Sequence, residues 1–219
     1  MVRPLMGILG GTFDPVHVGH LQLARAAIQS LNLDVLRCIP AGQPPLRHQP
    51  EATAAARLAM VHLAFDGEPR CVVDDAEIRQ TGFSWTIRTL ERLRTKAPES
   101  ALVLIVGADA LLGLPGWHRW QELLDFAHIA VANRPGTSLQ PAAMPAALAA
   151  LWQAHQTPDV STLHQSPAGR IVSFTIAPCP VSATAIRQRV ARGEPVTGQV
   201  SAAVENYIHS HHLYSLAAH

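Results

Sequence analysis

The sequence contains little charge of either sign. Of its 219 residues, 15% are charged, and the formal net charge at pH 7 is +1. Proteins that bind nucleic acid through its phosphates carry a broad basic surface, so this balance predicts no nucleic-acid partner. The sequence also lacks an apolar run of bilayer length and a leader with a basic segment, an apolar stretch and a cleavage site. We therefore expect no membrane partner and a cytoplasmic location.

Groups that hold metals or form covalent intermediates are scarce as well. The three cysteines lack the spacing of metal ligands or redox pairs, and their odd number argues against a disulfide framework. The sequence has no Ser or Cys on a glycine elbow, no carboxylate pair at metal-binding spacing and no G-x-x-x-x-G-K-[ST] loop. We expect no protein metal ligands and a reaction without a covalent protein intermediate.

Glycines, a proline and two histidines gather instead in one stretch, residues 10–20. The apolar run Leu5–Leu9 predicts a buried strand before it, and apolar residues at helical spacing predict a helix after it. A helix N-terminus favours an anion because it presents unpaired N–H groups and the positive end of the helix dipole. His17 and His20 would share one face of the first helical turn, and Gly19 would let a ligand approach the backbone. The alternative is a surface loop with two solvated histidines.

Apolar runs that alternate with helical periodicity predict an α/β protein. The fold expected is a Rossmann-like, doubly wound parallel sheet with helices on both faces. We expect one nucleotide-handling domain, residues 1–219, with a small helical portion at 182–219 and a variable peripheral connection at 137–169. Ser84 is the predicted N-cap of a helix that ends before Pro98. Further strands are predicted at 35–40, 70–74, 101–106, 129–132 and 170–176, and further helices at 53–65 and 201–211.

Polar groups follow several predicted strands, at the sheet edge where open α/β sheets bind ligands. Arg47 lies in a proline-rich loop and is either a phosphate contact or a solvated arginine. Asp109 follows Gly107 at the end of a buried run, where it could bond a ribose or another substrate hydroxyl, or cap a helix from Ala110. Trp117 and Trp120 lie at a Pro-Gly turn, where one of them would present a flat face for stacking a ring and the other could be a core residue. Arg134 lies at another strand tip.

A second candidate anion site follows the last predicted strand. Ser182 is a natural N-cap, Thr184 falls in the first turn, and Arg187 lies one turn further along the same face. Two such turns suit a polyphosphate with one end held at each. Phosphoryl and nucleotidyl transfers are reactions of this kind, because positioning and charge stabilisation carry their catalysis.

The run Gly-Gly-Thr-Phe-Asp-Pro-x-His-x-Gly-His at residues 10–20, with Ser-x-Thr-x-x-Arg at 182–187, resembles the nucleotidyltransferase superfamily that carries the HxGH signature. Within it the chain is similar to bacterial nicotinate mononucleotide adenylyltransferases, chiefly at Ser84–Thr86 and Trp117. The similarity covers most of the chain. Its other matching segments are Pro44-Pro45, Gly107–Asp109, Asn133–Gly136 and the ending Tyr207–Tyr214.

The resemblance implies transfer of the adenylyl group of ATP to nicotinate mononucleotide, giving deamido-NAD and pyrophosphate in NAD biosynthesis. It implies catalytic roles for His17, His20 and Arg187, and Mg²⁺ carried by the ATP phosphates. The ATP-binding residues implied are Gly10, Gly11, Thr12, Phe13, Gly19, Ser182 and Thr184. The substrate-binding residues implied are Arg47, Thr86, Gly107, Asp109, Trp117 and Arg134.

The sequence departs from the family pattern at two places. Leu46-Arg47 follows the proline pair where the family carries His-Lys, and Ala183 stands where serine is usual. The alternatives are the same chemistry on nicotinamide mononucleotide, phosphopantetheine or a polyol phosphate, and a nucleotide-binding sensor without turnover. Intact His17, His20 and Arg187 argue against the sensor. The oligomeric state stays open, a homo-oligomer included.

Overall fold

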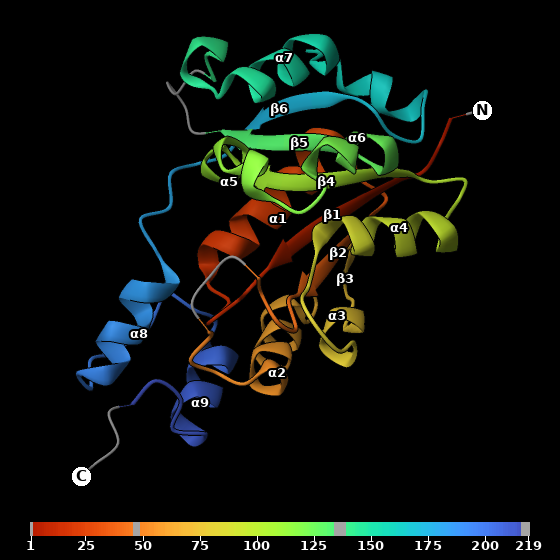
Figure 1. Ribbon diagram of the computed structural model, residues 1–219. Helices are drawn as coiled ribbons and strands as arrows, with labels where there is room; N and C mark the ends of the chain where they lie inside the picture. The colour runs from red at the N-terminus through yellow and green to blue at the C-terminus, as the bar shows by residue number, and fades with distance from the viewer. Residues whose placement is uncertain (1, 46–48, 134–138, 216–219) are drawn as a thin grey trace.

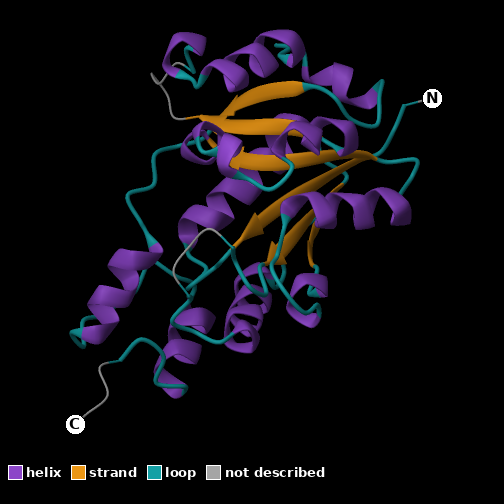
Figure 2. Ribbon diagram, viewed as in Figure 1, coloured by secondary structure: helices purple, strands orange, loops and turns teal. Residues whose placement is uncertain are grey.

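A computed structural model describes residues 2–45, 49–133 and 139–215 of the chain. Within them, six parallel strands form one sheet in the order β3-β2-β1-β4-β5-β6 (Figure 1). The predicted fold class, a doubly wound parallel sheet with helices on both faces, is confirmed (Figure 2). The strands are β1 (Leu5–Gly11), β2 (Val35–Pro40), β3 (Cys71–Val73), β4 (Ala101–Gly107), β5 (His128–Asn133) and β6 (Ile171–Thr175).

The helices divide between the two faces of the sheet. Buried residues of α1, α2, α8 and α9 pack on one face, and those of α4, α5, α6 and α7 pack on the other. The helices are α1 (Val18–Leu31), α2 (Ala54–Phe65), α3 (Ala76–Arg79), α4 (Thr86–Lys96), α5 (Ala108–Leu112), α6 (Leu123–Phe126), α7 (Ala146–His155), α8 (Ala183–Ala191) and α9 (Ala202–Ser210). Short 3₁₀ turns are η1 (Leu114–Gly116), η2 (Trp120–Glu122), η3 (Pro141–Ala143) and η4 (Val160–His164).

Two apolar cores follow from the alternation of side chains along the strands. In β4, Val103 and Ile105 face the core of α1 and α2, whereas Leu102 and Leu104 face the core of α4 and α6. Every residue of β4 from Ala101 to Val106 is buried, as expected of a strand covered on both faces. This explains why its sequence is a continuous apolar run.

The sheet reverses its winding between β1 and β4. The chain moves outward from β1 to β2 and β3 on one side, and from β4 to β5 and β6 on the other. The crossover segments diverge at this switch point and leave a crevice beyond the carboxyl ends of the two strands. In β1 those ends are Gly10 and Gly11, level with Ile39 and Pro40 of β2.

One predicted helix start is wrong. Helix α4 has Trp85 in its cap position, without a side-chain cap, so Ser84 lies one residue too early. The Ser84 hydroxyl instead accepts the N–H groups of Gly42 (2.9 Å) and Gln43 (3.3 Å). The Ser84 oxygen that would have capped the helix is therefore bonded to the backbone of a residue 42 positions earlier in the chain.

The connection between β5 and β6 contains η3, α7 and η4. Leu148 and Trp152 of α7 are buried in the core shared with α4 and α6. In Figure 1 this segment runs along the β6 edge of the sheet, far from α2 and α9. None of the helices in the described parts of the chain is long and apolar enough to cross a membrane.

Candidate active site

A cleft of about 1360 Å³ opens beyond the carboxyl ends of β1 and β4. It is lined by residues from both predicted anion turns and from the beginning of α4. Arg47 and Arg134 lie outside the described residues, so the structure places neither. The predicted site residues that line the cleft are Gly10, Gly11, Thr12, Phe13, His17, His20, Thr86, Gly107, Asp109, Trp117, Ser182, Thr184 and Arg187.

Residues 10–20 form the first turn of the cleft, and the Phe13 side chain supports this turn by packing inside it. This residue has left-handed backbone angles (φ 52°), and only 2% of its surface is exposed. A Cβ atom on Gly11 would lie 3.2 Å from the Phe13 ring, so the ring occupies the space that a side chain at Gly11 would need. The ring also meets His20 edge-on, with centroids 4.8 Å apart. Phe13 therefore shapes the turn by packing, with little of its own surface presented to the cleft.

The two histidines at the start of α1 are held against each other. His17 caps the helix, and its backbone N–H donates to Nδ1 of His20 at 3.1 Å. The ring centroids lie 3.9 Å apart, with 35° between the planes. Because Nδ1 of His20 accepts a hydrogen bond, the neutral ring carries its proton on Nε2.

Burial sets the charge of the first histidine. It lowers the pKa of His17 from 6.5 to about 4, so the ring is neutral at pH 7 in the ligand-free cleft. Its Nδ1 atom is buried against the first turn of α1, where the His17 side chain and the His20 backbone form half of a capping box.

Gly19 is constrained by packing. A Cβ atom there would lie 3.0 Å from Cε1 of His17 and 3.3 Å from Sγ of Cys179. Sequence reasoning assigned this glycine to the close approach of a ligand, and the structure adds a different reason. With no side chain at Gly19, the His17 ring and the segment before α8 can both pack against the start of α1.

The second anion turn begins α8 as predicted. Ser182 caps the helix by accepting the N–H of Ala185 at 3.2 Å. Arg187, one turn further on, donates from Nη1 to the Asp14 carbonyl at 2.8 Å and from Nε to a Glu51 carboxylate oxygen at 2.6 Å. Two turns separated by 173 residues in sequence are thus joined by one arginine.

Asp14 ties the first turn to two other segments, a role that the sequence did not reveal. Its carboxylate accepts the N–H groups of Glu51 (2.8 Å) and Ala52 (3.1 Å) and the hydroxyl of Tyr214 (2.7 Å). Burial, followed by the hydrogen bond to Asp14, raises the pKa of Tyr214, which therefore stays protonated and donates. The motif around Asp14 marked its importance, but neither partner segment could be identified from local patterns.

Arg57 is a second residue that sequence reasoning missed. Its exposed fraction is 1%, and its guanidinium donates to four backbone carbonyls. These belong to the first turn, the loop after β2 and the segment before α2. A single arginine within the apolar run of α2 was the available signal. The acceptors are the carbonyls of Thr12 (2.7 Å), Ala41 (2.7 Å), Gly42 (3.0 Å) and Ala52 (3.3 Å).

Aromatic side chains line the end of the cleft near α4. Trp85 packs against His118 with centroids 4.8 Å apart, and both residues line the cleft with Trp117. Trp117 is partly buried against the core of α4 and α6 while part of it remains exposed. Sequence reasoning singled out Trp117 and missed Trp85 and His118. These flat surfaces suit the ring of a substrate.

Asp109 lies at the carboxyl end of β4 and lines the cleft. Helix α5 begins at Ala108 with Gly107 in the cap position. The alternative that Asp109 caps a helix from Ala110 is therefore wrong, and its carboxylate lies within the first helical turn. There it faces the same crevice as the histidines of α1.

Comparison with known proteins places the chain in a family. The cytidylyltransferase-like family model matches residues 8–189. A protein of Laribacter hongkongensis named "Probable nicotinate-nucleotide adenylyltransferase" is 47% identical, over 97% of this chain and 95% of the relative. One of Dechloromonas aromatica with the same name is 45% identical, over 98% and 99%.

A solved structure shares the fold at low sequence identity. The Plasmodium falciparum nicotinic acid mononucleotide adenylyltransferase complexed with NaAD has a TM-score of 0.71 and 12% identity, over 97% of this chain and 98% of that one. This likeness supports the arrangement of sheet and helices alone. Taken with the full-length similarity of the bacterial relatives, the comparisons show that the chain belongs to the cytidylyltransferase-like family, alongside the bacterial proteins named nicotinate-nucleotide adenylyltransferases.

Proposed function

We propose that the protein transfers the adenylyl group of ATP to nicotinate mononucleotide, giving deamido-NAD and pyrophosphate in NAD biosynthesis. The observation that carries this proposal is the meeting of both anion turns in one cleft, joined by Arg187. The curated relatives named nicotinate-nucleotide adenylyltransferase, similar over nearly their whole length, support the same reaction.

ATP would lie across the first turn with its phosphates over the start of α1. Gly10, Gly11 and Thr12 would line the turn with backbone groups, and the N-terminus of α1 would favour the negative charge. His17 and His20 would donate hydrogen bonds to phosphate oxygens and stabilise the charge that develops during transfer. A neutral imidazole can donate a hydrogen bond through its N–H group and keep its proton, which suits this role for His17.

The part of ATP that leaves would be held at the second turn. Ser182 and Thr184 would offer hydroxyl and backbone groups, and Arg187 would offer a guanidinium suited to phosphate oxygens. Arg187 already bonds Glu51 and the Asp14 carbonyl, which fixes its direction before ATP arrives. Because Arg187 is already held in place, less of its conformational entropy is lost when ATP binds.

The acceptor would lie toward α4 with its nicotinate ring near Trp117. Backbone N–H groups around Thr86, at the helix N-terminus, would meet the nicotinate carboxylate, and Asp109 would contact a ribose hydroxyl. Helix α4 has no acidic residue of its own in its first turn, and its N-terminal N–H groups and dipole favour an anion. This favours the acid over the amide form of the mononucleotide.

The reaction needs no covalent bond to the protein. An oxygen of the acceptor 5′-phosphate attacks the α-phosphorus of ATP, and the bond from that phosphorus to the β-phosphate bridging oxygen breaks. The electron pair and the developing charge leave with pyrophosphate, where Arg187 and the α8 turn would stabilise them. Catalysis of this kind rests on alignment and charge stabilisation.

Mg²⁺ would enter bound to the ATP phosphates and neutralise part of their charge. The donor set near the phosphates fits a metal held mainly by phosphate oxygens. The cleft there presents imidazoles, a guanidinium, hydroxyls and N–H groups, and the Asp14 carboxylate already accepts two N–H groups and one hydroxyl. No group of three ligating side chains lies together in the part of the chain that the structure describes.

The proposal is tested by following pyrophosphate release with Mg-ATP and each candidate acceptor. We expect much faster release with nicotinate mononucleotide than with nicotinamide mononucleotide, phosphopantetheine or a polyol phosphate. The His20→Ala variant should lose about two orders of magnitude or more in turnover, because one preorganised donor to a transition state contributes roughly that much. Equal rates with the acid and amide forms, or no release by the unmodified protein, would contradict the proposed acceptor.

A further inference from the structure

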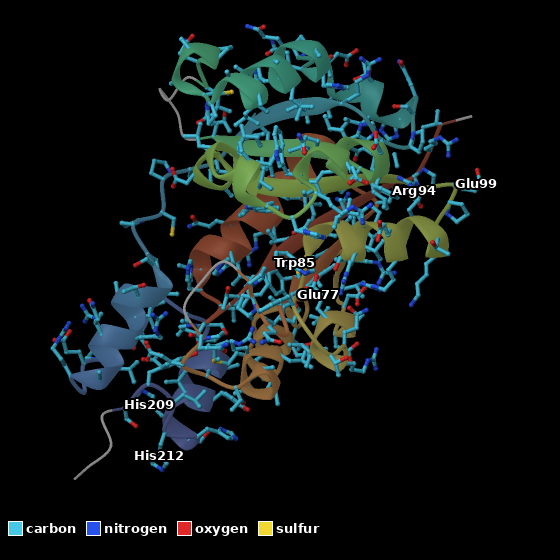
Figure 3. All side chains as sticks on the ribbon, viewed as in Figure 1. Glu77, Trp85, Arg94, Glu99, His209 and His212 are labelled. Atoms are coloured by element: carbon cyan, nitrogen blue, oxygen red, sulfur yellow. The ribbon has the colours of Figure 1, made fainter. Side chains whose placement is uncertain are left out.

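A buried carboxyl group with no part in the proposed chemistry lies at the α4 end of the cleft. Glu77, in α3, has an exposed fraction of 8% and lines the cleft beside Ser84 and Trp85. Glu77 and Trp85, both labelled in Figure 3, line the same cleft. Burying a carboxylate is unfavourable unless hydrogen bonds compensate it, so its partners indicate what it is for.

Two hydroxyl groups on different elements point at this carboxyl group. Thr89 of α4, itself buried, donates to Oε1 of Glu77 at 2.5 Å. The Ser84 hydroxyl interacts with the same carboxyl group and lowers its pKa. The Ser84 oxygen already accepts two backbone N–H groups, so its proton is available for Glu77. These two hydroxyls lower the pKa of Glu77, while its burial, the larger effect, raises it.

Ser84, Glu77 and Thr89 together connect the loop after β2 to the beginning of α4. Gly42 and Gln43 donate to Ser84, and Ser84 and Thr89 converge on Glu77. The backbone N–H of Ser84 returns a bond to the Gln43 carbonyl at 2.9 Å. Each member of such a chain polarises the next, so the chain holds its elements together more firmly than separate bonds would.

The loop after β2 packs directly on the backbone of Glu77. A Cβ atom on Gly42 would lie 2.1 Å from the Glu77 carbonyl oxygen. Arg57 binds the Gly42 carbonyl from the other side at 3.0 Å. The loop is therefore fixed between α2 and α3, and Glu77 extends that fixed point to α4.

We propose that Glu77 is a positioning residue of the acceptor subsite, which sets the beginning of α4 and the loop after β2 through Ser84 and Thr89. It touches no reacting atom. Its effect falls on the nicotinate end of the acceptor, because Trp85 and Thr86 follow Ser84 directly and line that end. The inference rests on the proposed function, since it assigns the acceptor to this end of the cleft.

The test compares the KM values for both substrates in Glu77→Ala and in a matched control. Glu77→Ala should raise KM for nicotinate mononucleotide about tenfold or more, the loss expected from one to two hydrogen bonds at the subsite, and leave KM for ATP within about twofold. Glu99→Ala is the control, because Glu99 is 91% exposed and lies at the far end of the α4 region in Figure 3. It should leave both KM values unchanged.

Two milder variants keep the test decisive if Glu77→Ala folds poorly. Thr89→Val and Ser84→Ala each remove one hydroxyl from the carboxyl group, and each should raise KM for the acceptor alone. The double variant Glu77→Ala/Thr89→Val should bind the acceptor no worse than Glu77→Ala, because the Thr89 hydroxyl acts through its bond to Glu77.

The outcomes separate the inference from the function on which it rests. If the unmodified protein does not adenylate nicotinate mononucleotide, the proposed function fails and the inference fails with it. If the unmodified protein is active and the Glu77, Ser84 and Thr89 variants raise both KM values equally, or lower thermal stability alone, the carboxyl group is only structural and the inference is overturned.

Discussion

At the scale of single residues, the cleft owes its properties to groups whose ordinary chemistry has been changed by burial. His17 is neutral because its surroundings exclude water, and Tyr214 keeps its proton for the same reason. His17 caps the helix that follows the first turn, and Tyr214 donates a hydrogen bond to Asp14 within that turn. The turn is therefore organised before a nucleotide arrives.

The lowered pKa of His17 makes stability depend on pH. Between pH 6.5 and about 4 the unfolded chain binds a proton at this ring and the folded chain does not. The free energy of unfolding should therefore fall as the pH drops through this window, by at most about 3 kcal/mol from this residue. Above pH 6.5 the His17 ring is neutral in both the folded and the unfolded chain, so it no longer makes the free energy of unfolding depend on pH.

Urea unfolding of the protein and of His17→Asn at pH 7, 5.5 and 4.5 measures this effect. The unfolding free energy of the unmodified protein minus that of His17→Asn should fall steadily as the pH is lowered. Contributions from other histidines cancel in that difference, because both proteins contain them. A difference that stays constant with pH would mean that His17 titrates normally in the folded protein.

At the scale of elements, the site depends on contacts between segments that local patterns do not connect. Strand β4, the helix cap at Ser182 and the helices near 53–65 and 201–211 could be predicted, because their signals lie within a few neighbouring residues. The true start of α4 could not, because the hydroxyl of Ser84 binds a loop 42 residues earlier.

Arg57 shows the same limit for the site. Its place in an apolar helix marked it as unusual, but its four acceptors belong to three different segments. Sequence reasoning named many of the residues that line the cleft, since these carry a motif. It could not identify Arg57 and Asp14 as the residues that hold the segments of the turn together.

Replacing Arg57 should destabilise several elements at once. Arg57→Met would leave four backbone carbonyls without their shared donor, and we expect the free energy of unfolding to fall by about 3–5 kcal/mol, as when one partner of a buried charged network is removed. Arg57→Lys should lose less, since the ammonium keeps three donors but cannot span the four acceptors.

The measurement is chemical denaturation, with Arg88→Ala as the control. Arg88 is an exposed arginine on α4, and its removal should change the free energy of unfolding by less than about 0.5 kcal/mol. If Arg57→Met were as mild as Arg88→Ala, the four bonds would contribute little.

At the scale of the whole molecule, segments far apart in the sequence meet at the first turn. Tyr214 donates to Asp14 across 200 residues, and Arg187 reaches the same residue across 173. The sheet places the cleft at its switch point, and residues at the beginning of α8 then line one side of it.

Tyr214→Phe tests this closure while preserving the ring. Loss of a hydroxyl that donates to a buried carboxylate should lower the free energy of unfolding by about 1.5–3 kcal/mol and raise KM for ATP. Tyr207→Phe is the matched control, because its ring stacks on His211 and that stacking does not use the hydroxyl. Identical behaviour of the two variants in denaturation and kinetics would show that the Asp14 contact is dispensable.

The bonds of Asp14 also bear on the order in which the molecule can form. Loop closure costs more entropy as the intervening chain lengthens, so contacts across 173 and 200 residues are unfavourable until the sheet has brought their ends together. On a growing chain, the strands of the central sheet are synthesised before α8 and Tyr214. The bonds that Asp14 makes with Arg187 and Tyr214 can therefore form only after the sheet has been synthesised, although Asp14 itself precedes almost all of it in the sequence.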